Sequence, residues 1–210
     1  NILSANTNLE MILLEETFET IGAGTEITPN STGTWKIKPL SGDENWNGSS
    51  NVGTKWYVNN AAGGFSCAIN NNSLVMKDVQ GSGAIGINCD YFWGVDPPDG
   101  SYDEMDQVAY LTSNIDARNY ANLNLRFSYK LNGDIRSGTV YDYMQVVYST
   151  NGGTSWTSLN EGNSQGTYSD NNGVNNGYSG TGNGSTVISG TTVISLPSSL
   201  NGASNLLIGF

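Results

Sequence analysis

Residues 123–159 read LNLRFSYKLNGDIRSGTVYDYMQVVYSTNGGTSWTSL, and the first nine of them alternate between apolar and polar side chains. A two-residue period is typical of a β-strand with one buried face and one solvent-facing face. The stretch 123–131 therefore predicts a half-buried strand. Its inward-facing residues are Leu123, Leu125, Phe127, Tyr129 and Leu131, and its outward-facing residues are Asn124, Arg126, Ser128 and Lys130.

The same stretch predicts two further strands. A polar, glycine-containing link at 132–138 leads into a run rich in Tyr and Val at 139–149. Asn151-Gly152-Gly153 then supplies residues that tolerate a positive φ, so the chain can turn back into 154–159. We expect three consecutive antiparallel strands here, with the rest of the chain covering or extending their sheet.

The composition favours a single all-β domain. The chain has 210 residues, of which 37% are apolar and only 13% are charged, and 27 are glycine. Further short strands are expected at 11–18, 34–37, 54–59, 65–69, 73–77, 84–88, 107–112 and 186–196. The natural arrangement for ten or more such strands is a jelly-roll β-sandwich of two antiparallel sheets with long irregular loops.

Two segments define the expected domain limits. Residues 161–184 are rich in Gly, Asn and Ser and almost free of aliphatic side chains, which predicts a flexible surface loop. Asn205–Phe210 reads NLLIGF, a strand pattern that stops in mid-course. We therefore expect one domain over residues 1–210, in a natural chain that continues past 210.

The charge balance argues against nucleic-acid and membrane binding. The formal net charge is −11, with 19 Asp+Glu against 8 Lys+Arg, and this field repels phosphate backbones and anionic lipids. No stretch approaches the roughly 20 apolar residues needed to span a bilayer, so direct membrane insertion is not expected. The same excess of carboxylates suits the binding of a cation.

Catalysis is largely excluded by residue type. The chain has no histidine, which removes histidine-based triads and His-ligated zinc sites. Two carboxylates can still cleave a glycosidic bond, but nothing in the spacing selects a pair, so we expect no enzyme. The two cysteines, Cys67 and Cys89, match no zinc or redox motif, and they either form a disulfide or are small buried residues.

Four segments in order resemble the cleaved-adhesin and "choice-of-anchor J" domains, which are relatives of the MAM-type jelly roll. They are ETFE at 16–19, YLTS at 110–113 before LNLRFSYK, DYMQVVYSTNGGTSW at 142–156, and ISLPSSLNGASNLLIGF at 194–210. The resemblance implies a jelly roll of a secreted or surface protein of Bacteroidetes-type bacteria, with structural calcium and a role in adhesion or carbohydrate binding. The acidic residues usual on the family's last strand are missing here.

Calcium is the expected cofactor. It takes six to eight oxygen ligands, and residues 96–106 place five acids in eleven residues on a backbone kinked by Pro and Gly. The alternative is that these are solvated loop acids. The resemblance adds two glutamates of the first segment, and one acid of the next long loop could join either group. The expected metal ligands are Glu16, Glu19, Asp43, Asp96, Asp99, Asp103 and Asp106.

Aromatic residues in loops are the expected ligand-binding group, because flat aromatic faces stack on sugars and exposed aromatics mark binding surfaces. The candidates are Trp46, Tyr91 and Trp93, whereas Trp35, Trp56 and Trp156 are expected in the core. The sequence thus predicts a non-catalytic extracellular or cell-surface module that binds a glycan or a host or neighbouring surface protein. The alternative is an architectural module that contacts only other domains of its polypeptide; a carbohydrate-active enzyme is a third reading.

Overall fold

The computed structural model describes residues 11–39, 54–59, 72–78, 107–131, 135–140, 143–162, 164–165, 167–168, 176–179 and 188–210. Within these ranges the secondary structure is all β, apart from the 3-10 helix η3 (Ser198–Leu200). This confirms the all-β class, and the jelly-roll arrangement stays a prediction. No described helix has the length and apolar character needed to cross a membrane. The strands are β1 (Thr25–Ile27), β2 (Trp35–Pro39), β3 (Thr54–Asn59), β4 (Ser73–Asp78), β5 (Gln107–Leu111), β6 (Asn124–Leu131), β7 (Ile135–Arg136), β8 (Thr139–Val140), β9 (Val147–Ser149), β10 (Thr157–Ser158), β11 (Ser164–Gln165), β12 (Thr167–Tyr168), β13 (Asn176–Gly177), β14 (Ile188–Ser195) and β15 (Leu207–Gly209).

The largest sheet has five antiparallel strands in the order β10-β9-β15-β5-β2. Strands β5 and β15 lie inside it and are largely apolar, with Val108, Ala109 and all three residues of β15 buried. Gly209 is required by close packing, because a Cβ there would lie 2.6 Å from Val108 Cγ1. An added methyl group at this position would therefore force the neighbouring atoms of β5 to move.

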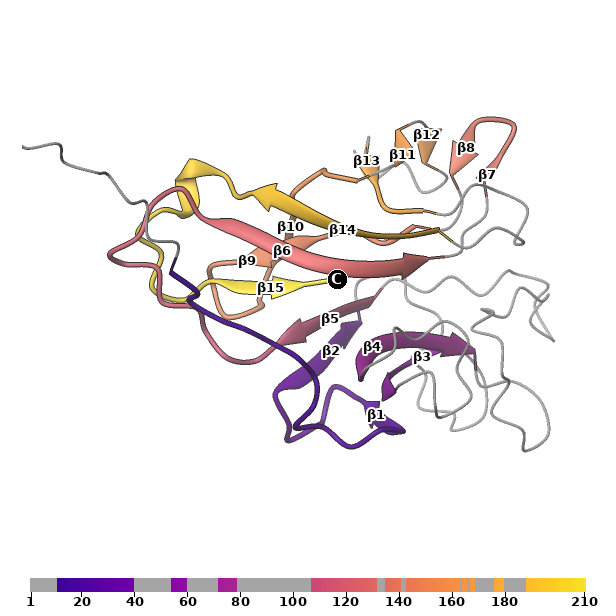
Figure 1. The fold of residues 1–210 in the computed structure, drawn as a ribbon, viewed down its shortest axis with the longest axis horizontal. Coiled ribbons are helices and arrows are strands. Elements are labelled where there is room, and N and C mark those ends of the chain that lie inside the picture. Colours follow the sequence, from indigo (N-terminus) through magenta and orange to yellow (C-terminus); the bar gives the residue numbers. More distant parts are fainter. Residues whose placement is uncertain are drawn as a thin grey trace, which may run out of the picture.

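Two smaller sheets pack with the five-stranded sheet. Strand β14 pairs with β6 over eight residues, and β3 pairs with β1 and β4. In Figure 1, strands β15, β5 and β2 lie between the β14–β6 ribbon and the β1–β3–β4 sheet. One core cluster joins residues of β6 and β14 to Leu206 and Ile208, and a second joins β1, β2, β3 and β5 around Trp35 and Trp56.

A row of aromatic rings connects the two clusters. Phe18 stacks on Trp35 at 5.2 Å, Trp35 on Phe210 at 6.4 Å, and Phe210 meets Phe127 edge-on at 5.3 Å. Phe127 in turn contacts Tyr178 at 5.4 Å. Because Phe210 packs against both clusters, this row makes the two halves of the core continuous.

The central strand prediction is confirmed, but its pairing was wrong. Strand β6 shows the expected alternation of exposed and half-buried residues. Its partner, however, is β14, and the predicted strand 139–149 is divided into β8 and β9. Beyond β6, Ser137 and Gly138, both with positive φ, close a tight β7–β8 hairpin. The expected Asn-Gly-Gly turn is present, and β9 pairs with β10 beyond it.

One other segment differs from expectation. Residues 11–24 contain no strand, so the strand predicted at 11–18 is wrong, and the first strand within the described residues begins at Thr25. Within 161–184, the described residues include the two-residue strands β11, β12 and β13, and Tyr178 is 4% exposed. Burial raises the pKa of this Tyr178 hydroxyl. Tyr178 thus packs this described part of the stretch against the core.

Candidate functional site

The candidate site in the described part of the chain is built on the 16–21 turn, which we define as residues Glu16–Ile21. Its centre is Phe18, whose φ of +60° is unusual for a bulky residue. Such a conformation costs about 1–3 kcal/mol and persists only where neighbouring contacts enforce it. The turn therefore needs strong local interactions, and Glu16 supplies them.

The Glu16 carboxylate bridges two donors. Oε1 accepts a hydrogen bond from the Phe18 backbone N–H at 2.6 Å, and Oε2 accepts one from the Trp35 indole N–H at 3.2 Å. Trp35 is only 2% exposed, so its N–H would be costly to leave without an acceptor. One side chain thus holds the strained residue and ties the turn to β2.

Asn72 and Glu19 join the turn to β4. The Asn72 side-chain amide donates to the carbonyl oxygens of Phe18 at 3.4 Å and Ile21 at 3.0 Å. The Asn72 backbone N–H, directly before β4, donates to Glu19 Oε1 at 3.3 Å. The 16–21 turn therefore gathers two carboxylates and two carbonyl groups from six consecutive residues.

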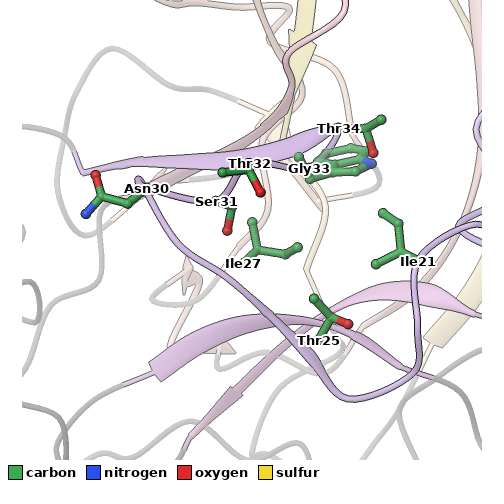
Figure 2. Close-up of a pocket in the computed structure, with 9 residues that line it drawn as sticks. Ile21, Thr25, Ile27, Asn30, Ser31, Thr32, Gly33 and Thr34 are labelled. Atoms are coloured by element: carbon green, nitrogen blue, oxygen red, sulfur yellow. The ribbon is translucent and has the colours of Figure 1, made fainter.

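An open pocket lies beside the turn, with a volume of about 420 Å³. Figure 2 shows Ile21, Thr25 and Ile27 around the same space, with Ser31 and Thr32 on its other side and Asn30 at its outer end. Ile21 belongs to both the turn and the pocket. No residue that lines the pocket has a titratable side chain, so its chemistry is that of hydrogen bonding and apolar contact.

The structure describes only two of the predicted site residues, Glu16 and Glu19, and brings them into one turn. Within the described ranges no three Asp, Glu, His or Cys residues gather in one place. A cation at this turn would therefore need backbone carbonyls or residues from elsewhere as further ligands, and the calcium prediction stays a prediction. The other predicted residues lie outside the described ranges: Asp43, Trp46, Tyr91, Trp93, Asp96, Asp99, Asp103 and Asp106, together with Cys67 and Cys89.

Sequence reasoning missed two parts of this site. Trp35 is buried, as predicted, but its hydrogen bond to Glu16 was not foreseen. Asn72 lies between the strands predicted at 65–69 and 73–77, and the contact of its amide with the 16–21 turn was not foreseen. Neither contact has a local signal in the sequence. Glu16 and Trp35 are 19 residues apart, and Asn72 is at least 51 residues from its partners in the turn. An Asn next to a strand was the only available hint.

No protein-family model, curated protein or solved structure matches the chain. The resemblance to cleaved-adhesin domains, read from the four segments above, therefore stays a prediction.

Proposed function

We propose that the chain is a non-catalytic, adhesin-like module of a secreted or cell-surface protein. It holds structural calcium and binds a glycan or a neighbouring surface protein through its loops, and it contacts other domains of its own polypeptide. The proposal is consistent with an all-β fold, a net charge of −11 and a chain without histidine.

The acid-rich stretch 96–106 is the observation that carries the proposal. It holds five carboxylates in eleven residues and ends directly before Gln107, the first residue of β5. That strand lies inside the five-stranded sheet, with Val108 and Ala109 buried. The stretch thus leads directly into a buried strand. We propose that a divalent cation binds there and offsets the repulsion between its carboxylates.

The 16–21 turn fits calcium in its chemistry. Its possible metal-ligand atoms are all oxygens, namely those of the Glu16 and Glu19 carboxylates and of the Phe18 and Ile21 carbonyls. Calcium prefers this mixture of carboxylate and carbonyl ligands. Glu16 and Glu19 would hold the ion, whose charge would stabilise the strained turn. Each of these groups already accepts a hydrogen bond within the protein, but each keeps a further lone pair with which it could coordinate the ion.

Loop aromatics are the proposed ligand contacts. Three of the five tryptophans have packing roles: Trp35 and Trp56 are buried, and Trp156 packs on Tyr110 with ring centroids 5.1 Å apart. We propose that Trp46 and Trp93, with Tyr91, form the stacking surface for a sugar.

A glycan array tests the binding role. The chain should give a signal with calcium present that is lost on Trp93→Ala and retained on Trp93→Phe, which keeps a flat ring for stacking. The Trp46→Ala variant tests the second tryptophan in the same way. A blank array with strong contacts to neighbouring domains in the native assembly would favour the architectural role instead. Turnover of a polysaccharide by the isolated chain would overturn the non-catalytic assignment.

A further inference from the structure

Strand β14 turns one edge toward β6 and the other edge away from it. Its register with β6 runs from the Ile188–Leu131 pair to the Ser195–Asn124 pair. The Leu196 N–H donates to the Leu123 carbonyl at 2.9 Å, which continues the same register. In an antiparallel ladder, hydrogen-bonded pairs alternate with pairs that are not hydrogen-bonded. The even-numbered residues of β14 therefore bond to β6, and the odd-numbered ones direct their N–H and C=O groups outward: Ser189, Thr191, Val193 and Ser195.

The outward edge of β14 is open in the part of the chain that the structure describes. All four odd-numbered residues are exposed, and Val193 is 60% exposed. Their backbone groups have no hydrogen-bond partner among the described residues. Two of these residues form side-chain hydrogen bonds with β6, Thr191 with Ser128 and Ser195 with Asn124.

This edge lacks the devices that normally prevent strands from pairing with other chains. Edge strands are usually protected by charged side chains, proline or a bulge. The sequence of β14, ISGTTVIS, has no charge and no proline, and its register shows no bulge. Its Thr, Val and Ile residues also favour extended backbone. The edge is thus suited to accept another strand.

We propose that β14 pairs with β14 of a second copy of this chain, giving a four-stranded sheet in the order β6–β14–β14–β6. A two-fold axis through Thr192 places Ser189 opposite Ser195 and Thr191 opposite Val193 of the other copy. Every outward group of one strand then meets an outward group of the other, so the edge is self-complementary.

The charge of the two strands is compatible with pairing at this edge. Two copies of a chain with net charge −11 repel each other at most approaches. Neither β14 nor β6 contains an acidic residue, and the only charged side chains on the two strands are Arg126 and Lys130. Pairing of the two β14 strands therefore brings no carboxylates of these strands together. Because one strand edge is smaller than a standard interface, the association is weak and depends on concentration.

Sedimentation equilibrium from about 1 µM to about 1 mM covers weak association. The average mass should rise from 22.3 kDa toward twice that value. Val193→Pro removes one outward N–H but no bond to β6, so it should keep the mass at that of one chain. The Val193→Thr control keeps the N–H and should still associate, and Val193→Lys, a charged edge, should not. A mass of one chain at every concentration overturns the proposal, as does unchanged association of Val193→Pro.

Hydrogen exchange distinguishes a second copy from another covering segment. In dilute solution the amides of the four odd-numbered residues should exchange fast while the even-numbered ones are protected. At high concentration both sets should be protected. Protection of both sets in dilute solution would show that the same chain covers this edge, and would overturn the proposal.

Discussion

Replacing Glu16 with Gln tests the role of its carboxylate in the 16–21 turn. The two carboxylate oxygens accept from two different donors, the Phe18 N–H and the Trp35 indole N–H. A glutamine has the same size but only one oxygen. Whichever way the amide turns, its NH₂ group faces one of the two donors, so one N–H loses its acceptor.

The magnitude follows from burial. Trp35 is 2% exposed and Phe18 is half-buried, so water cannot fully replace the lost acceptor. An unsatisfied buried donor costs about 1–3 kcal/mol. For a chain of this length each kcal/mol lowers Tm by about 2–4 °C, so Glu16→Gln should lower Tm by about 2–12 °C.

Thermal unfolding in EGTA measures this effect without a contribution from calcium. The matched control is Glu15→Gln, because Glu15 is exposed and has no hydrogen bond in the described structure. A surface change of this kind stays within about 0.5 kcal/mol. In a Trp35→Phe background, which lacks the indole N–H, Glu16→Gln should cost at least about 0.5 kcal/mol less, a coupling typical of residues in contact. Equal effects of Glu15→Gln and Glu16→Gln, or equal costs in both backgrounds, would refute the reasoning.

Three further predictions concern other parts of the fold. Gly209→Ala should cost about 1–3 kcal/mol in urea unfolding, because its Cβ would lie 2.6 Å from Val108 Cγ1, and an unchanged midpoint would contradict this packing. Hydrogen bonds from Arg118 lower the pKa of the Asp116 carboxyl to about 2. The stability that they add to the folded chain is therefore present above pH 3.8 and lost as the pH falls toward 2. An NMR titration of Arg118→Gln should show the pKa of Asp116 return toward 3.8. Burial, with a smaller contribution from a nearby glutamate, raises the pKa of Tyr57 to about 12, so stability should fall as the pH rises from 10 through 12, and Tyr57→Phe should lack this fall in urea titrations.

Strands with a clear two-residue period were predictable from the sequence. The alternation in 123–131 gave β6, the Thr/Val/Ile run gave β14, and NLLIGF gave the buried β15. These signals are local, since each depends on which side chains one short segment can bury. The burial of Trp35 and Trp56 followed from the strands predicted at 34–37 and 54–59.

Pairing and the site were not predictable in the same way. Strand β6 pairs with β14, about 60 residues away, although a nearer Tyr/Val run was available. The nearer run is instead divided by the β7–β8 hairpin. This hairpin has a positive φ at Ser137, a conformation that serine does not favour, so the sequence gives no sign of it. Phe18 adopts its positive φ only because Glu16, Trp35 and Asn72 hold the turn, and such long-range contacts leave no mark in the local sequence.

Thermal unfolding with excess calcium, and again after EGTA, tests the proposed calcium-dependent module most directly. A ligand that binds only the folded chain at a hundred times its Kd adds about 2.7 kcal/mol, which should raise Tm by about 5–11 °C at this chain length. The rise should shrink in a double variant, Asp103→Asn with Asp106→Asn, and persist in Glu15→Gln. Identical curves with and without calcium, from a sample in which a metal assay finds no bound ion, would contradict the proposal.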